Sequence, residues 1–343
     1  MNARTPRYTG VVPPVVTPLT ADGEIDTASL ERLVAFLLEG GVSGLFALGS
    51  SGETAYLTDA QKDLAVDTIV GATAGQVPVV VGTIEQTTNR AIERGRAALK
   101  SGADAVVATA PFYTRTHDTE IDRHFRLVAD AVDLPLLAYD VPVCVHSKLS
   151  TDLVLRLAAD GVLAGVKDSS GDDVGLRYLC LGARELPDFS VLTGHEVIVD
   201  AMLLGGADGA VPGLGNVDPH GYVRLDRLAA AGDWAAAKAE QDRIARLFEI
   251  VTVTAPGTAS ATAAGLGAFK TALQVRGIID TNSLGTSRFT GEIVEGLRSG
   301  RIKEGGWITP DDLFEYLTAQ MVIKGVPEEQ RPTKSTIRAT RSL

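Results

Sequence analysis

The chain has 343 residues, of which 45% are apolar, and a formal net charge of −11 at pH 7, so it can fill the core of one large α/β domain. The acidic balance argues against a nucleic-acid partner, because binding phosphates needs a basic patch. Only Cys144 and Cys180 occur, far apart in the chain, so the sequence suggests neither a disulfide framework nor a zinc site and fits a reducing cytoplasm.

Short apolar runs rich in β-branched residues recur along the chain and predict eight strands. In chain order they lie at 11–16, 44–48, 77–82, 104–109, 134–139, 162–167, 190–194 and 207–212. Helical patterns alternate with them, as at 29–38 and 122–132, where apolar residues recur with the period of an α-helix. Strands that alternate with helices pair in parallel through crossovers.

This alternation predicts an α/β fold of the (β/α)8 TIM barrel type, in which active sites form at the C-terminal ends of the strands. A doubly wound sheet is the alternative fold. That fold would place a G-x-G-x-x-G turn after the first strand, and the sequence has none there.

Three helical stretches follow the eighth strand, at 220–232, 233–251 and 263–278. One would complete the barrel, and the other two would cover one side of it or an interface. We therefore predict a barrel over 1–232, a C-terminal helical extension over 233–280 and a tail over 281–343, which includes a candidate helix at 310–321. We expect no targeting or membrane-spanning segment, and hence a cytoplasmic protein without a membrane partner.

Chemically useful side chains lie where four of the predicted strands end. The turn Gly49-Ser50-Ser51-Gly52-Glu53 follows the second strand, Tyr113 follows the fourth, Tyr139 ends the fifth and Lys167 ends the sixth. Three of them have a purely structural alternative: a capped turn at 49–53, a core tyrosine at 139, and a lysine at 167 that reaches solvent or pairs with Asp168. Because all four fall at matching strand ends of one predicted barrel, a shared site is favoured.

Imine formation with a 2-oxo acid needs this set of side chains. A lysine amine has an ordinary pKa of about 10.4, and burial favours its neutral, nucleophilic form. Tyr139 would transfer protons if its hydroxyl is tied to a relay. Backbone N–H groups of the turn, with the hydroxyls of Ser50 and Ser51, would hold the substrate carboxylate. The five histidines form no ligand cluster in the sequence, so we expect no metal and no cofactor.

These motifs and their order resemble the pyruvate-dependent class I aldolases that include dihydrodipicolinate synthase, N-acetylneuraminate lyase and 2-keto-3-deoxygluconate aldolase. The likeness runs from about Val11 to Gly277. The family's G-[ST]-[ST]-G-E turn matches 49–53, which implies that Ser50 joins a proton relay and that Ser51 holds the pyruvate carboxylate, with Gly49 beside it.

Two further motifs of the family are present. Its Tyr-Asn-x-Pro strand end stands here as Tyr139-Asp140-Val141-Pro142, and its G-x-K-[DE] motif as Gly165-Val166-Lys167-Asp168. The resemblance makes Tyr139 the acid–base group and Lys167 the Schiff-base lysine. The family's Pro-[FY]-Tyr element ends here in Tyr113, which implies that this tyrosine reaches a neighbouring subunit's site in a homo-oligomer, by family habit a dimer of dimers.

Departures from the family's pattern bear on the substrate. Dihydrodipicolinate synthases carry an arginine five residues after the strand-five tyrosine, where this chain has Cys144. The nearby His146 cannot reproduce the bidentate fork of an arginine. Neuraminate lyases place a serine near the end of the eighth strand, where this chain has Pro212 and Gly213. Both substrates are therefore disfavoured by these positions.

The leading interpretation is a Schiff-base aldolase or lyase that cleaves or forms a 2-keto-3-deoxy sugar acid from pyruvate, or another 2-oxo acid, and an aldehyde. His195 is a candidate for substrate hydroxyls, with a surface role as its alternative. The alternatives are dihydrodipicolinate (4-hydroxy-tetrahydrodipicolinate) synthase, a sugar-acid dehydratase that uses the same imine, and a non-catalytic barrel that binds 2-oxo acids. The remaining expected substrate-binding residues are Gly194, Val211, Glu196 and Cys144.

Overall fold

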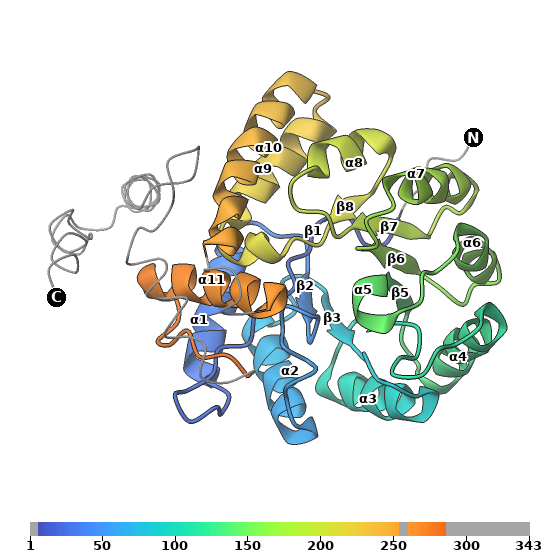
Figure 1. The fold of residues 1–343 in the computed structure, drawn as a ribbon, viewed down its shortest axis with the longest axis horizontal. Helices are drawn as coiled ribbons and strands as arrows, with labels where there is room; N and C mark the ends of the chain where they lie inside the picture. The colour runs from blue at the N-terminus through green and yellow to red at the C-terminus, as the bar shows by residue number, and fades with distance from the viewer. Residues whose placement is uncertain (1–5, 254–259, 286–343) are drawn as a thin grey trace, which may run out of the picture.

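Eight parallel strands close into a barrel surrounded by helices (Figure 1). The structure is a computed structural model that describes residues 6–253 and 260–285. The strands are β1 Gly10–Val11, β2 Leu45–Ala47, β3 Val79–Gly82, β4 Ala105–Ala108, β5 Leu136–Asp140, β6 Gly165–Asp168, β7 Ser190–Thr193 and β8 Gly209–Ala210. They pair in the order β1-β8-β7-β6-β5-β4-β3-β2, and a parallel bridge between Pro14 and Phe46 joins the two ends. The predicted (β/α)8 barrel and all eight strand positions are confirmed.

The helices follow the strands as predicted. They are α1 Thr27–Glu39, α2 Asp59–Thr73, α3 Thr88–Ser101, α4 Asp118–Ala131, α5 Pro142–Val145, α6 Thr151–Ala159, α7 Asp173–Gly182, α8 Val199–Gly205, α9 Pro219–Ala230, α10 Trp234–Phe248 and α11 Ala261–Val275, with short 3-10 turns η1 Ala183–Glu185, η2 Gly213–Asn216 and η3 Glu249–Thr252. Helix α4 begins at Asp118, earlier than its apolar period predicts, because His117 and Glu120 form a reciprocal capping box.

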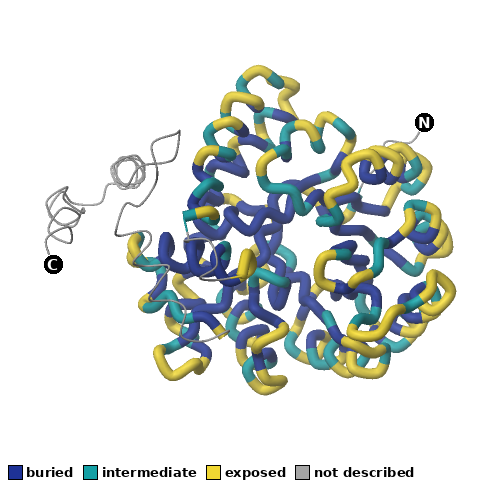
Figure 2. The backbone as a smooth tube through the Cα atoms, viewed as in Figure 1, coloured by how far each residue is buried: buried dark blue, intermediate teal, exposed yellow. Residues whose placement is uncertain are grey.

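The core lies in and around the barrel, where the strands are buried along their whole length (Figure 2). Closure of the barrel depends on small residues at one contact. A Cβ built on Gly209 of β8 would lie 2.2 Å from the carbonyl oxygen of Gly10 in β1. Glycine therefore allows the two backbones to approach closely enough to pair.

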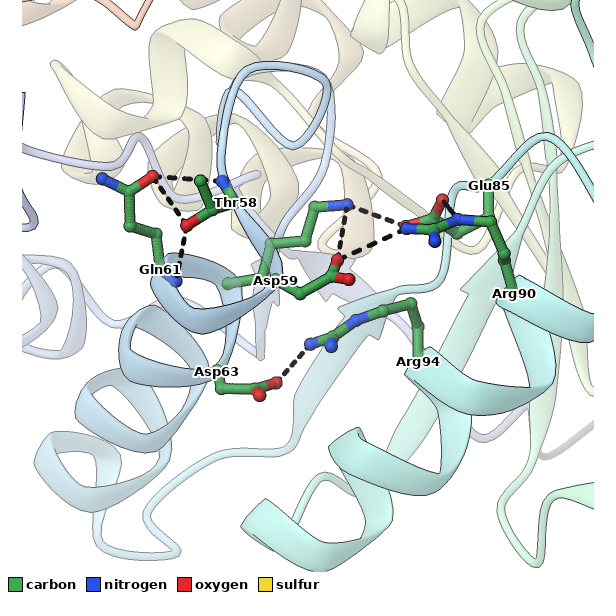
Figure 3. A network of polar contacts seen from close by, with 8 residues as sticks. Thr58, Asp59, Gln61, Asp63, Glu85, Arg90 and Arg94 are labelled. Atoms are coloured by element: carbon green, nitrogen blue, oxygen red, sulfur yellow. Dashed lines mark hydrogen bonds and ion pairs between the residues drawn. The ribbon is translucent and has the colours of Figure 1, made fainter.

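A polar network ties helix α2 to the segment that follows β3 (Figure 3). Lys62 of α2 and Glu85 form a buried ion pair at 2.7 Å, and Arg90 of α3 contacts the other oxygen of Glu85 at 2.9 Å. Thr58 caps α2 in a capping box with Gln61. The network therefore joins the first turns of α2 and α3 through Glu85.

Helix α11 lies against the turn at 49–53 and the η2 segment. A Cβ built on Gly213 of η2 would meet the Phe269 ring of α11 at 2.9 Å. Lys270 of α11 is fully buried and forms an ion pair with Glu53 of the turn. The segment after α11 returns to the same turn, since the Gly285 backbone N–H donates to Glu53 Oε2 at 2.6 Å. The extra C-terminal helices thus cover one side of the barrel, while the candidate helix at 310–321 lies outside the described residues.

Candidate active site

Lys167 and Tyr139 lie side by side at the C-terminal ends of two adjacent strands. They are direct partners in the parallel register of β5 and β6, and both side chains are buried. The Lys167 Nζ atom lies 4.2 Å from the centroid of the Tyr139 ring and 5.1 Å from that of Phe46. The alternative of a lysine that reaches solvent or pairs with Asp168 does not hold, because the amine packs on two aromatic rings and neighbouring strand residues point to opposite faces.

The Tyr139 hydroxyl is in contact with Ser50. The distance between Tyr139 Oη and Ser50 Oγ is 3.3 Å, and either atom can donate. The Tyr139 ring also packs edge-to-face on Phe46, with centroids 6.3 Å apart. A tyrosine that acts on protons needs a second hydroxyl to pass them on, and this pair supplies one. The structure therefore brings together three of the predicted catalytic residues.

The turn at 49–53 has a backbone that its sequence explains. A Cβ built on Gly49 would lie 2.9 Å from the Phe46 ring, so glycine is needed where the turn crosses this ring. The turn closes through hydrogen bonds from the Gly52 N–H to the Gly49 carbonyl and from the Glu53 N–H to the Ser50 carbonyl, at 3.0 and 3.1 Å. Glu53 has φ of 60°, a strained value for a non-glycine residue that its buried contacts hold in place.

Glu196 places a carboxylate beside this turn. It accepts a hydrogen bond from the Leu214 backbone N–H at 2.6 Å. Burial raises the pKa of Glu196 to about 7, opposed by backbone hydrogen bonds from Leu214 and Gly213 and by the charge of Lys167. A cavity of about 220 Å³ opens here, and it is lined by Ser50, Ser51, Glu196, Phe248, Val251, Ala261, Thr262, Gly265, Leu266 and Phe269.

Gly194 and Val211 contribute backbone positions around the same end of the barrel. A Cβ built on Gly194 would lie 1.9 Å from Ser169 Oγ, and the Gly194 N–H donates to the Asp168 carbonyl at 2.6 Å. Val211 is buried, and its N–H donates to the Thr193 carbonyl at 2.8 Å. Both residues therefore extend the hydrogen bonding of β6, β7 and β8 beyond the strands.

Three residues considered for the second substrate are Cys144, His146 and His195. Cys144 is exposed on α5; partial burial of its thiol raises the pKa of Cys144, and the Lys167 amine opposes this shift. His146 is exposed and ends α5 in the left-handed conformation, with φ of 59°. His195 Nε2 lies 2.9 Å from Asp173 Oδ1 of α7, and the His195 side chain is 26% exposed.

Tyr113 lies apart from the buried pair within its own chain. Its side chain is 91% exposed, and its backbone has φ of 78°. A positive φ is rare for a bulky residue and is kept only where the surrounding structure imposes it. The loop after β4 thus projects a strained, exposed tyrosine, and Tyr113 does not join the other three predicted catalytic residues inside one subunit.

Two groups near the site were not predicted from the sequence. Asp140 and Asp168 follow Tyr139 and Lys167 in β5 and β6 and share Lys148, and Glu53 is paired with Lys270. The sequence carried one signal for the group of Asp140, Asp168 and Lys148: the chain has aspartate at 140 where the family motif has asparagine. The partner of Glu53 could not be found in this way, because it is distant in the sequence.

No helix within residues 6–253 and 260–285 has the length and hydropathy to cross a membrane. Over the same ranges, no group of three or more His, Cys, Asp or Glu side chains is arranged to bind a metal ion.

Comparisons with known proteins agree with one another. The sequence matches the model of the dihydrodipicolinate synthetase family over residues 7–283. The 4-hydroxy-tetrahydrodipicolinate synthase of Laribacter hongkongensis is 35% identical over 242 residues, which cover 70% of this chain and 82% of that protein.

Solved structures give the same result. The E. coli K12 prophage protein YagE, of the dihydrodipicolinic acid synthase family and in complex with pyruvate, aligns with a TM-score of 0.76 and 26% identity over 94% of this chain and 100% of its own. The dihydrodipicolinate synthase of Bacteroides thetaiotaomicron aligns with a TM-score of 0.79 and 27% identity over 86% and 99%.

Proposed function

The chain belongs to the dihydrodipicolinate synthetase family of pyruvate-dependent class I aldolases and lyases, and we propose that its reaction begins with an imine between pyruvate and Lys167. The observation that carries this proposal is the buried Lys167 amine against Tyr139, whose hydroxyl contacts Ser50 at 3.3 Å. Lys167 is the amine, and Tyr139 with Ser50 is the proton relay.

In the first step, the neutral Lys167 amine attacks the ketone carbon of pyruvate. The two protons that the nitrogen loses pass one after the other through the Tyr139 hydroxyl to the ketone oxygen. The C–O bond then breaks, the oxygen leaves as water and the imine remains. The backbone N–H groups of the turn at 49–53 and the Ser51 hydroxyl hold the pyruvate carboxylate. The imine withdraws electrons, so the methyl carbon can lose a proton and attack the carbonyl carbon of an aldehyde.

For the aldehyde, our first candidate is the one used by 4-hydroxy-tetrahydrodipicolinate synthases, because relatives with that name resemble most of this chain. Their product equals pyruvate plus aspartate semialdehyde less one water, which identifies aspartate semialdehyde as the aldehyde. This candidate fits the names of the relatives better than the sugar acid that the sequence alone favoured.

A second candidate rests on Cys144 and Glu196. A thiol at 144 gives the aldehyde's carboxylate no charged donor, whereas the Glu196 carboxyl beside the turn suits a substrate hydroxyl. These two positions support cleavage or dehydration of a 2-keto-3-deoxy sugar acid through the same imine.

We further propose that Tyr113 completes the site of a neighbouring subunit in a homo-oligomer, in agreement with its exposure of 91%.

The test begins with pyruvate and borohydride, followed by intact mass measurement and peptide mapping. A reduced pyruvate adduct on Lys167 is expected in the wild type and in Lys100→Ala, an exposed lysine at the end of α3, but not in Lys167→Ala. The absence of an adduct on folded wild-type protein would refute the imine.

The aldehyde is then identified from products. Pyruvate consumed with aspartate semialdehyde supports the first candidate, and pyruvate released from a 2-keto-3-deoxy sugar acid supports the second. Loss of water without pyruvate release identifies a dehydratase. Cys144→Arg sharpens the comparison, since an arginine fork should lower the KM for aspartate semialdehyde only if that carboxylate is bound there.

A further inference from the structure

Two buried carboxylates lie directly behind the Lys167–Tyr139 pair. Asp140 follows Tyr139 in β5, Asp168 follows Lys167 in β6, and the two aspartates are partners in the parallel register. Their side chains are 1% and 2% exposed. Because successive strand residues point to opposite faces, these carboxylates lie on the outer side of the strands when the catalytic pair faces the barrel interior.

One cation serves both carboxylates. The Lys148 amine forms an ion pair with Asp140 Oδ2 and lies 4.0 Å from Asp168 Oδ2. That Asp168 oxygen has no hydrogen-bond partner among the described residues, whereas its other oxygen accepts the Ser170 N–H at 2.8 Å. Removing Lys148 would therefore leave two adjacent buried carboxylates without a neutralising charge.

The same lysine fixes the loop that follows β5. Lys148 Nζ donates to the Leu149 carbonyl at 3.0 Å, and the Leu149 N–H donates to Asp140 Oδ1 at 3.1 Å. Residues 141–149 are thus closed back onto the end of β5, and this segment carries Cys144. Burial raises the pKa of Asp140, and the hydrogen bond from Lys148 opposes that shift. The Lys148 cation therefore favours the ionised form of Asp140.

We propose that Lys148 is a positioning residue that joins β5 to β6 through Asp140 and Asp168 and so holds the Tyr139 hydroxyl in register with the Lys167 amine. The inference rests on the proposed function, because it assigns Lys148 a role in the rate of imine formation. It applies to a chain with aspartate at 140, since an asparagine there would leave Asp168 as the single carboxylate beside Lys148.

The test measures the rate of imine formation by rapid mixing with saturating pyruvate and quenching with borohydride, together with kcat and KM. In Lys148→Met we expect imine formation and kcat to fall about 10- to 100-fold, because a small displacement of reacting groups costs that much. The KM for pyruvate should change by less than about threefold, since Ser51 and the turn at 49–53 are untouched.

A double variant separates positioning from loss of packing. Asp140→Asn/Lys148→Met also lacks the lysine but removes one of the two carboxylates, so only Asp168 is left without its cation. Imine formation should therefore be faster than in Lys148→Met. Lys148→Arg, which keeps the charge, should also be close to the wild type. Lys100→Met is the surface control. If Lys148→Met does not fold, Lys148→Gln, which lacks the charge but keeps a donor, takes its place in the comparison.

The proposal is overturned if folded Lys148→Met or Lys148→Gln forms the imine at the wild-type rate, or if the double variant is as slow as the single one. Both outcomes leave the adduct on Lys167 in the wild type and thus leave the proposed function intact. Failure of the proposed function looks different, because the wild type itself would then form no adduct.

Discussion

Replacing Lys270 by methionine is expected to destabilise the protein strongly, because it leaves a buried carboxylate without its cation. Lys270 and Glu53 are both fully buried, and burial lowers the pKa of Lys270 while the charge of Glu53 opposes this. Methionine has nearly the volume of lysine, so little cavity results. The substitution therefore isolates the loss of charge and of the hydrogen bond from Lys270 to the Ser283 carbonyl, at 2.7 Å.

Breaking a buried ion pair from one side typically costs about 3–5 kcal/mol. The lower end of this range applies here, because Glu53 keeps the hydrogen bond from the Gly285 N–H at 2.6 Å. In a domain of this size, a loss of 3 kcal/mol lowers the melting temperature by about 6–10 °C. The loss also loosens the strained turn at 49–53, so the KM for pyruvate should rise together with the fall in stability.

The assay is denaturant and thermal unfolding at one fixed protein concentration, with pyruvate saturation measured on the same preparations. Lys238→Met is the matched control, because Lys238 forms an exposed pair with Asp242 along α10 and should change neither quantity measurably. Glu53→Gln/Lys270→Met removes both charges and should lose less stability than Lys270→Met alone. The reasoning is refuted if Lys270→Met is as stable as the control, or if the double variant is the least stable of the three.

Three further results are expected. Tyr139→Phe should reduce kcat about 10²- to 10⁴-fold with little change in the KM for pyruvate, and full activity would exclude Tyr139 as the acid–base group. Folding raises the pKa of Glu196 from 4.5 to about 7, so the folded state binds more protons between these values and the stability that Glu196 contributes is lost as pH rises through them. The difference in unfolding free energy between the wild type and Glu196→Gln should fall over that interval, and a flat difference would contradict the buried carboxyl. Mixed oligomers of Tyr113→Phe and Lys167→Ala subunits should regain activity that neither variant has alone, whereas no recovery on co-refolding would show that Tyr113 does not serve a neighbouring site.

The sequence was sufficient to predict the barrel because the signals involved are local. Each strand is a short apolar run, and parallel strands in a barrel must bring their C-terminal ends together. The neighbours Tyr139 and Lys167 could thus be paired before the structure was known, since consecutive strands of a barrel are adjacent. Ser50 was assigned to the relay by the family resemblance, and its Oγ lies 3.3 Å from the Tyr139 hydroxyl.

Buried charges could not be predicted in this way. An apolar period indicates which residues are buried, but it does not say which cation pairs with which carboxylate. Lys270 is the one charged residue among the buried residues of α11, and its partner Glu53 belongs to a turn near the other end of the described chain. Glu196 and His195 are adjacent in the sequence, yet one lines the cavity and the other pairs with Asp173 at the surface.

Under the proposed function, the groups that would form the imine are separated from those that would choose its partner. Lys167 and Tyr139 lie on strands in the core, whereas Cys144 lies in the loop that Lys148 closes onto Asp140. Because strands resist displacement and a surface loop accepts substitution, exchanges in 141–149 can alter the aldehyde without altering pyruvate chemistry. Such an exchange should keep Lys148, since without it Asp140 and Asp168 are two adjacent buried carboxylates with no cation beside them.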